Sequence, residues 1–483
     1  MSRVSHISRS VLLVAVTLIA VDATAIGQQA VTKNSKARGY VPTPTASTTK
    51  GLWAYEAGGK RYCLQTLGTG GLGIIDTTDT SNPVLVRTVP GNFRKVQVWQ
   101  NYAYATTDSG PTQIIDLTNP SQAQIVNTMS TGAHTLRIDQ SNGRMYFNRS
   151  SAMYIYDLTA DPENPDQLGI WIGGAHDCRP VGNIVYANGF QTIPTRILEV
   201  SDPNNVVQLG TVPNGNHSSD LYVTPTGQKV LVTCDEQSSG HVNLFDVSNP
   251  ADVNALGSYM TEPGTSVHNV EVKGAYAYIG YYQDQMRVID LRDPTNPVEV
   301  GIWDNNRLNT GSTYSDAWEA IPDHDAVYMN QMNDTLAANK GTFVIDFFPG
   351  FGTASDGTGG KKPEAWWSFG PPSPGNNRFA LRLTDALPNT PAYLIIGYSN
   401  TQWGALPLPA TMGLIGAPNA TLYSSADILI QTATDAQGKA SVLLPIPAGL
   451  PFNTFYTQWA VKDPGAPNPG GWAFTKGGEL VIH

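Results

Sequence analysis

Apolar and polar residues alternate in short runs along most of the chain. The run VHNVEVKGAYAYIGYY, which starts at Val267, alternates on both sides of a Lys-Gly pair. The run AHTLRIDQSNGRMYFNRS, which starts at Ala133, does the same around Asn-Gly. Alternation with a period of two residues around such a turn is typical of a β-hairpin. We therefore predict that each of these segments is the inner hairpin of a sheet.

A short phrase recurs seven times along the sequence. It consists of two mostly apolar residues, an acidic residue and, in most copies, a following Asn-Pro or Asp-Pro step. The acidic residues are Asp76, Asp116, Asp157, Glu199, Asp246, Asp290 and Asp346. Successive acidic residues are 40 to 56 positions apart. Such a period fits four short strands per repeat, as in a β-propeller blade, better than it fits a helical solenoid.

Each part of the phrase has a structural reason. The acidic side chain is expected to end a strand by accepting backbone N–H groups in an Asx-type turn, and proline cannot continue the ladder of hydrogen bonds. A second run follows each proline, and we predict that these runs are the outermost strands. They cover residues 84–91, 123–132, 167–173, 206–215, 253–264 and 298–311.

The composition changes after the seventh phrase. Residues 350–377 are rich in Gly, Ser, Pro and Lys, which is typical of a linker. Within them, the apolar segment 364–369 is expected to add a last blade strand or a contact between domains. Residues 378–483 hold short apolar runs between Pro/Gly turns, which predicts a β-sandwich. The predicted fold is all-β, a seven-bladed β-propeller followed by a small β-sandwich, with six blades if the seventh phrase belongs to the linker.

The first 25 residues have the order of a secretory signal. Basic residues Arg3 and Arg9 precede the apolar run 11–21 and the small-residue step Ala23-Thr24-Ala25. The apolar run is too short to cross a bilayer as a helix. The predicted organisation is therefore a signal peptide (1–25), an N-terminal extension (26–50), the propeller (51–349), the linker (350–377) and the β-sandwich (378–483). We expect a secreted, extracellular or cell-surface protein without a membrane span after signal removal.

The repeats resemble those of LVIVD-repeat β-propellers, found in bacterial secreted proteins of the choice-of-anchor B type. The resemblance covers about residues 51–349 and implies a fold and an extracellular setting rather than a reaction. Two copies depart from the pattern, because the fourth carries Glu199 and the seventh runs into Phe347-Phe348-Pro349. The C-terminal region, with SNTQWGALPLPA from Ser399 and QWAVKDPGAPNP from Gln458, resembles a module of planctomycete-like secreted proteins.

Charge and cysteine content exclude some classes of partner and framework. The net charge is -10, and the chain has no clustered basic run, so a nucleic-acid partner is not expected. Cys63, Cys178 and Cys234 are too few for a disulfide framework, and we predict buried thiols, with one bridge as the alternative.

Four histidines occupy equivalent places at the start of predicted inner strands. They are His134, His176, His217 and His268, and the corresponding place in another unit holds Tyr314-Ser315-Asp316. Since the innermost strands of a propeller surround its channel, we predict that these imidazoles gather near one mouth of it. Together with Asp177, Asp220 and Asp316 they are candidates to bind a ligand, and the four histidines are candidates to hold a divalent metal such as zinc, iron or manganese.

A structural role is the main alternative for these histidines. A residue locked into a repeat can bond the backbone of the neighbouring blade, and this role is repeated wherever the repeat occurs. No nucleophile elbow, P-loop, HExxH or dinucleotide motif is present. The sequence therefore favours a secreted or cell-surface binding or scaffold protein with an extracellular protein or carbohydrate as partner. The alternative is an extracellular metal-assisted hydrolase or lyase that uses the histidine ring.

Overall fold

The computed structural model describes residues 31–44, 48–108, 110–214, 216–238, 240–305, 314–323, 326–332, 340–368 and 370–482. Within these ranges the chain is nearly all β-strand and contains no α-helix, only short 3-10 turns at Pro120–Gln122, Thr358–Gly360 and Gly413–Ile415. In the same ranges no helix has the length and apolar character needed to cross a bilayer. The predicted signal peptide lies outside the described residues.

Antiparallel sheets of four or five strands follow one another along the described chain. The first three are β3 (Leu52–Ala57), β4 (Lys60–Thr66), β5 (Leu72–Asp76) and β6 (Val84–Val89); β7 (Lys95–Trp99), β8 (Tyr102–Thr106), β9 (Thr112–Asp116) and β10 (Gln124–Met129); and β11 (Thr135–Asp139), β12 (Arg144–Asn148), β13 (Met153–Asp157) and β14 (Asp166–Trp171). The next two are β15 (Asp177–Val181), β16 (Ile184–Asn188), β17 (Thr195–Glu199) and β18 (Val207–Val212); and β19 (Ser218–Val223), β20 (Lys229–Cys234), β21 (Val242–Asp246) and β22 (Asn254–Tyr259).

The last two of these sheets include strands from the N-terminal part of the chain. One consists of β23 (Asn269–Lys273), β24 (Tyr276–Gly280), β25 (Met286–Asp290), β26 (Val298–Asp304) and β1 (Val31–Lys33). The other consists of β27 (Ala317–Asp323), β28 (Ala326–Gln331), β29 (Gly341–Phe347) and β2 (Ser35–Pro42). Five of the predicted outermost strands lie at the outer edge of their sheets, as β6, β10, β14, β18 and β22, whereas β26 is covered by β1.

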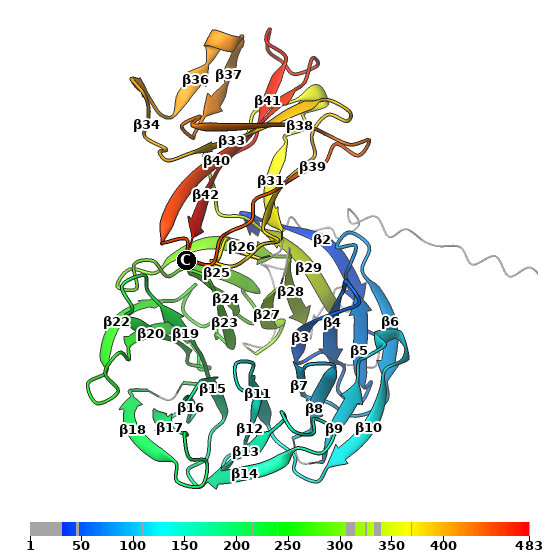
Figure 1. The fold of residues 1–483 in the computed structure, drawn as a ribbon, viewed down its shortest axis with the longest axis vertical. Coiled ribbons are helices and arrows are strands. Elements are labelled where there is room, and N and C mark those ends of the chain that lie inside the picture. The colour runs from blue at the N-terminus through cyan, green and yellow to red at the C-terminus, as the bar shows by residue number, and fades with distance from the viewer. Residues whose placement is uncertain are drawn as a thin grey trace, which may run out of the picture.

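The first strands of these sheets surround a common axis (Figure 1). Each contacts the next, from β3 through β7, β11, β15, β19 and β23 to β27, and β27 contacts β3. Sheets arranged radially in a closed ring, with their first strands innermost, are the architecture of a β-propeller.

The acidic residue of the phrase ends the third strand in six of these sheets, as predicted. In each of these six, its carboxylate accepts the backbone N–H of the residue two positions later, at 2.8 to 3.0 Å. The acceptors are Asp76, Asp116, Asp157, Glu199, Asp246 and Asp290. The seventh, Asp346, instead binds Arg38 and Arg382. The acid is therefore a turn-closing group in most copies.

The segment predicted as an N-terminal extension supplies two outer strands. β2 pairs antiparallel with β29, and β1 pairs with β26. The strand that lies beside the last one thus comes from Ser35–Pro42. Pairing of β2 covers the edge of β29, which would otherwise present unpaired backbone groups. β2 carries no copy of the phrase, so the repeat did not reveal this strand.

The C-terminal part forms two further sheets and two hairpins. The larger sheet has β30 (Gly350–Phe351), β42 (Gly477–Ile482), β40 (Asn453–Lys462), β33 (Pro391–Gly397) and β38 (Ile428–Ala433), with β41 (Trp472–Phe474) on β40. The smaller has β31 (Glu364–Ser368), β32 (Ala380–Thr384) and β39 (Ala440–Leu443). The hairpins are β34 (Gln402–Trp403) with β35 (Leu406–Pro407), and β36 (Ala410–Met412) with β37 (Ala417–Leu422). Buried side chains from both sheets, such as Leu383 and Trp459, share one core.

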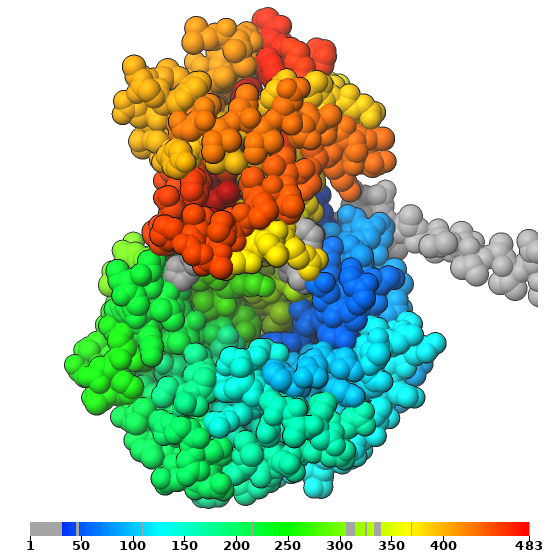
Figure 2. Space-filling model, in the orientation of Figure 1, coloured from blue at the N-terminus to red at the C-terminus, as the bar shows by residue number. Residues whose placement is uncertain are grey.

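This C-terminal part packs on the rim of the ring (Figure 2). Trp366 and Trp367, in the segment predicted as linker, belong to β31 and are buried. The ring of Trp367 lies 6.0 Å from that of Tyr276 and 5.6 Å from that of Phe347. One apolar core therefore continues from the propeller into the C-terminal part. The expected packed contact by this segment is confirmed.

The three cysteines are buried and unpaired, as predicted. Burial raises the pKa of the Cys178 thiol to about 12, so it stays protonated at neutral pH.

Candidate functional site

Each of the four predicted histidines directly precedes the first strand of a sheet. Their backbone N–H groups donate to carbonyl groups at the far end of the adjacent second strand. The pairs are His134 to Asn148 (3.0 Å), His176 to Asn188 (2.7 Å), His217 to Cys234 (2.7 Å) and His268 to Gly280 (3.0 Å). The inner hairpin thus holds all four residues at one level of the propeller, near one end of the channel.

The four imidazoles form a continuous row, which we call the His row. Successive ring centroids, from His134 through His176 and His217 to His268, are 4.5, 4.3 and 4.3 Å apart. The predicted gathering of these rings is therefore present. Neighbouring blades bring them into van der Waals contact, but along a row rather than around one point.

Two residues that sequence reasoning missed complete the circle. Arg94 precedes β7 and places its Nη2 2.9 Å from Nε2 of His134. The ring of Trp318, on β27, lies 4.6 Å from that of His268, and Cζ of Arg94 lies 4.9 Å from the Trp318 ring. Arg94 stands at the repeat position of the histidines, so aligning the repeats by their inner strands would have found it. Trp318 is displaced from that position because the register of β27 shifts between Ala317 and Ala320.

The hydrogen bonds of the imidazoles define their tautomers. Nδ1 of His217 lies 3.2 Å from the carbonyl oxygen of His268, and Nδ1 of His268 lies 2.8 Å from that of Trp318. A carbonyl only accepts, so both Nδ1 atoms carry the hydrogen and both Nε2 atoms keep a free lone pair. Metal-binding histidines commonly have this arrangement, with Nδ1–H on a carbonyl and Nε2 toward the ion.

Both Nε2 atoms face the carboxylate of Glu236, which follows β20. Nε2 of His217 lies 3.5 Å from one carboxylate oxygen, and Nε2 of His268 lies 4.0 Å from the other. The ligand atoms of these three residues all lie within 4.8 Å of one another, and the three are the group in the described ranges that could hold a metal ion. We call His217, His268 and Glu236 the triad. The hydroxyl of Tyr282 donates to Glu236 and orients it.

Burial keeps the imidazoles neutral. It lowers the pKa of His217 and of His268 well below the ordinary value, and the neighbouring histidines lower the pKa of His217 further. Burial also raises the pKa of Glu236. Two lone pairs that face one partly buried carboxylate favour a positive charge between them, either a proton or a cation. Two neutral imidazoles and one carboxylate are a donor set that zinc, iron(II) and manganese accept.

His134 and His176 continue the row away from the triad. Nδ1 of His134 lies 2.9 Å from Asp108, and its Nε2 meets Arg94. His176 packs between its two histidine neighbours and the ring of Phe190, 4.6 Å away, and its Nδ1 has no hydrogen-bond partner among the described atoms. Burial lowers the pKa of His176 to about 4.

A second set of charged side chains fills the channel beneath the His row. Arg137 binds Asp177 and Glu271, and Arg179 binds Glu271 and Asp220. The group, which we call the charged layer, consists of Lys95, Arg137, Asp177, Arg179, Asp220, Glu271 and Glu319. Side-chain exposure is 1% for Asp177, 2% for Arg137 and 26% for Arg179, so water has little access to the Arg137–Asp177 pair.

The predicted aspartates lie away from the triad. Asp177 accepts hydrogen bonds from Arg137 and from the backbone of Cys178, and so belongs to the charged layer. Asp316 precedes β27 and accepts from the Nε2 amide of Gln331 and the hydroxyl of Ser315. Asp220 binds Arg179 and the backbone of Val272.

Glu236 and Tyr282 were also missed as site residues. Glu236 lies in the loop between β20 and β21, two residues beyond the end of β20, and Asp108 and Tyr282 stand at the same place beyond β8 and β24. Aligning the repeats by their second strands would therefore have found this position. The side chains of Tyr281 and Tyr282 are both buried. The reason is that residues 281–285 turn back on themselves through backbone hydrogen bonds and bring Tyr282 toward Glu236.

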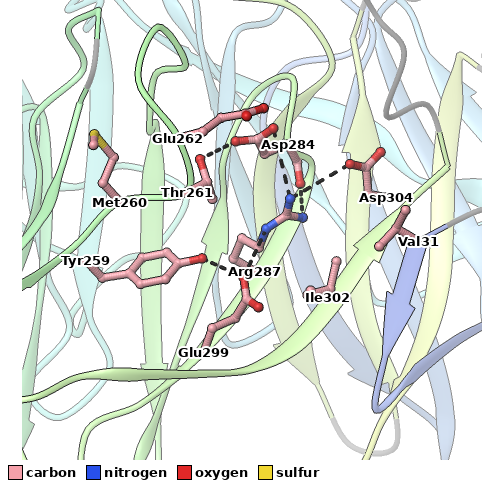
Figure 3. Close-up of a pocket in the computed structure, with 10 residues that line it drawn as sticks. All are labelled: Val31, Tyr259, Met260, Thr261, Glu262, Asp284, Arg287, Glu299, Ile302 and Asp304. Carbon is pink, nitrogen blue, oxygen red and sulfur yellow. Dashed lines mark hydrogen bonds and ion pairs between the residues drawn. The ribbon is translucent and has the colours of Figure 1, made fainter.

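A separate cavity of about 330 Å³ lies against the outer strands β22, β26 and β1. Four carboxylates line it, but the guanidinium of Arg287 points among them (Figure 3). Its nitrogen atoms lie 3.3 Å from Glu299, 3.8 Å from Asp304 and 4.0 Å from Asp284. Carboxylates of this cavity thus pair with Arg287 and not with a ligand, and the triad remains the better candidate site.

Comparison with known proteins supports the fold and not an activity. The family model of the LVIVD repeat matches residues 90–131, 243–261 and 264–305. No curated protein matches the chain in sequence. Similar solved structures include provisional 6-phosphogluconolactonases from Bacteroides fragilis NCTC 9343 and Bacteroides uniformis ATCC 8492, at 11% and 14% identity, each with a TM-score of 0.43. The matches cover 52% of this chain and 83% and 84% of those chains. The chain is thus a β-propeller protein that contains LVIVD repeats.

Proposed function

We propose that this protein is a secreted ligand-binding protein whose propeller holds a divalent cation in the triad of His217, His268 and Glu236. The ring of sheets is a seven-bladed propeller, and the C-terminal part is a β-sandwich. In this proposal the signal peptide ends near residue 25. The sandwich packs against the rim and fixes the orientation of the propeller relative to whatever carries the C-terminal part.

One observation carries the metal site. Nε2 of His217 and Nε2 of His268 are both held with a free lone pair toward one carboxylate by Nδ1–H bonds to backbone carbonyls. A purely structural histidine needs one such bond and gains nothing from a second lone pair that faces a carboxylate. A cation between the three groups removes this repulsion.

The distances are compatible with an ion after a small movement. Zinc binds imidazole nitrogen and carboxylate oxygen at about 2.0–2.2 Å. The triad atoms lie somewhat further apart than the ligands of such an ion, so closure requires side-chain shifts of about an ångström. Three protein ligands leave one or more positions on the ion for a water or for the bound ligand.

Elemental analysis tests this proposal. The protein is stripped with chelator, loaded with Zn²⁺, freed of excess metal by gel filtration and analysed for zinc. We expect about one zinc per chain in the wild type and close to none in the His217→Ala/His268→Ala double variant. The matched control, His134→Ala, removes a histidine of the same row and is expected to keep the metal. Full zinc content in the double variant would refute the site.

A second function, metal-assisted hydrolysis or elimination, is favoured by the open positions of a three-ligand ion. A metal-bound water in such a site becomes acidic enough to act as a nucleophile near neutral pH. Zinc-dependent hydrolysis of p-nitrophenyl acetate that disappears in His217→Ala would support this function. Equal rates with and without zinc would exclude it for ester substrates.

A further inference from the structure

We infer that the channel mouth binds an oxyanion with two negative charges, such as a dicarboxylate or a phosphate, held by the triad cation together with Arg94 and Lys50. This inference rests on the proposed function, because the cation is one of the two anchors. It adds the chemical class of the ligand and two residues that recognise it.

The first argument is the placement of the two cationic side chains. Both side chains lie against the ring of Trp318. Cζ of Arg94 is 4.9 Å and Nζ of Lys50 is 5.7 Å from the centroid of this ring. The same tryptophan ring lies 4.6 Å from the ring of His268, a triad residue. The Trp318 ring therefore contacts both cationic side chains and a triad residue.

The second argument concerns the partners of these cations. Arg94 has its Nε 3.2 Å from a carboxylate oxygen of Asp108, a side chain that is 52% exposed. The Lys50 ammonium, which is partly exposed, makes no hydrogen bond or ion pair with another described residue. Burial, followed by the charge of Arg94, lowers the pKa of Lys50. An anion at this place would relieve the repulsion between the two cations.

The third argument is the balance of charge at the mouth. Lys50 and Arg94 bring two positive charges beside Asp108 and Glu236, and the Nδ1–H bonds to carbonyls leave a lone pair on Nε2 of the two triad histidines. A bound divalent cation would add two further positive charges at the mouth. In a partly buried site such an excess favours a dianion over a neutral or cationic ligand.

The fourth argument is the direction of access. The charged layer closes the channel beneath the His row, since Arg137, Asp177 and Glu319 are almost completely buried. In the described part of the chain, a ligand would therefore approach the triad from the mouth that Lys50 and Arg94 border. Arg94 offers a planar fork of N–H donors that suits a carboxylate or phosphate.

Isothermal titration of succinate and of inorganic phosphate into the zinc-loaded, full-length protein tests this inference. Zinc content is measured first on every sample. We expect at least one of the two anions to bind the wild type, and to bind at least tenfold more weakly to Lys50→Gln and to Arg94→Gln, with zinc content unchanged. Lys60→Gln, a surface lysine of the same sheet as Lys50 that pairs with Asp76, is the matched control and is expected to leave the affinity unchanged.

The outcomes separate the two proposals. Absence of zinc in the wild type contradicts the proposed function and, with it, the cation anchor. Zinc at full content with no binding of either anion contradicts the ligand class alone. Equal affinity in wild type, Lys50→Gln and Arg94→Gln contradicts the role of the two cations, and equal affinity with and without zinc contradicts the role of the metal. Since Arg94 also supports the His row, Lys50→Gln decides the matter if Arg94→Gln does not fold.

Discussion

The His row and the charged layer come from neighbouring positions on the same inner strands, yet they satisfy their polar groups in opposite ways. In the charged layer, Arg137 and Arg179 each pair with a carboxylate of the next sheet and with Glu271 of β23, so their charges are paired within the protein. In the His row, backbone carbonyls use only one nitrogen of His217 and of His268, and the other nitrogen faces Glu236. The charged layer therefore pairs its charges within the protein, while the His row keeps nitrogen lone pairs that a ligand can use.

The largest effect is expected from breaking the charged layer. Arg137→Met would leave Asp177 and Glu271 without one of their main counter-charges at a buried site, where removal of one partner typically costs about 3–5 kcal/mol. Urea unfolding at pH 7 measures this loss. The control is Arg378→Met, which removes a solvent-exposed pair with Glu56 and is expected to cost less than about 1 kcal/mol. Equal losses of unfolding free energy in the two variants would show that the charged layer stabilises the fold no more than a surface ion pair does.

An intermediate effect is expected from the acid response of the His row. Burial lowers the pKa of His176 to about 4, below the ordinary value of about 6.5, so the unfolded chain takes up its proton more readily than the folded one. The contribution of neutral His176 to the free energy of unfolding is fully present above about pH 6.5 and is lost as pH falls through about 4. A shift of this size corresponds to roughly 3–3.5 kcal/mol.

His176→Phe removes this titration and keeps an aromatic ring beside Phe190. Urea unfolding of chelator-treated protein at several pH values between 7 and 4 compares the stability of the wild type with that of this variant. We expect the wild type to lose more stability on acidification than the variant. Parallel curves for the two proteins would mean that His176 is as readily protonated in the folded state as in the unfolded one.

The smallest effect is expected at the exposed end of the His row. The side chain of His134 is 31% exposed and binds Asp108 and Arg94. His134→Gln is expected to change the free energy of unfolding by about 1 kcal/mol or less, as for other partly exposed polar contacts. It should leave zinc content unchanged. Loss of the metal in this variant would restore the four-histidine site that the sequence alone suggested.

The repeat made the overall fold predictable, because each copy is one strand-turn unit with the same local chemistry. The turn-closing role of Asp116 and its equivalents follows from Asx geometry, which involves only neighbouring residues. The outer strand β2 was not predictable in this way, since it lies about 300 positions from its partner β29 and carries no copy of the phrase. Its pairing is fixed by the need to cover a sheet edge and not by a local motif.

The candidate site was predictable only in part for the same reason. The repeat position identified the histidines, and it would have identified Arg94. The loop position two residues beyond the second strand would have marked Glu236 as well. The repeat carried no information on the tautomers, which depend on carbonyl groups in the next blade. It also did not show that Asp177 turns toward Arg137. The repeat pattern thus predicted at which end of the channel the site lies. Which residues form the site depends on contacts between blades, which the pattern does not contain.

The most direct measurement of the central claim is X-ray diffraction from zinc-soaked crystals, with data on both sides of the zinc absorption edge. The account predicts one strong anomalous peak about 2.0–2.2 Å from Nε2 of His217, Nε2 of His268 and a carboxylate oxygen of Glu236. A map without a peak between these three side chains, at a zinc concentration that loads the protein in solution, would contradict it.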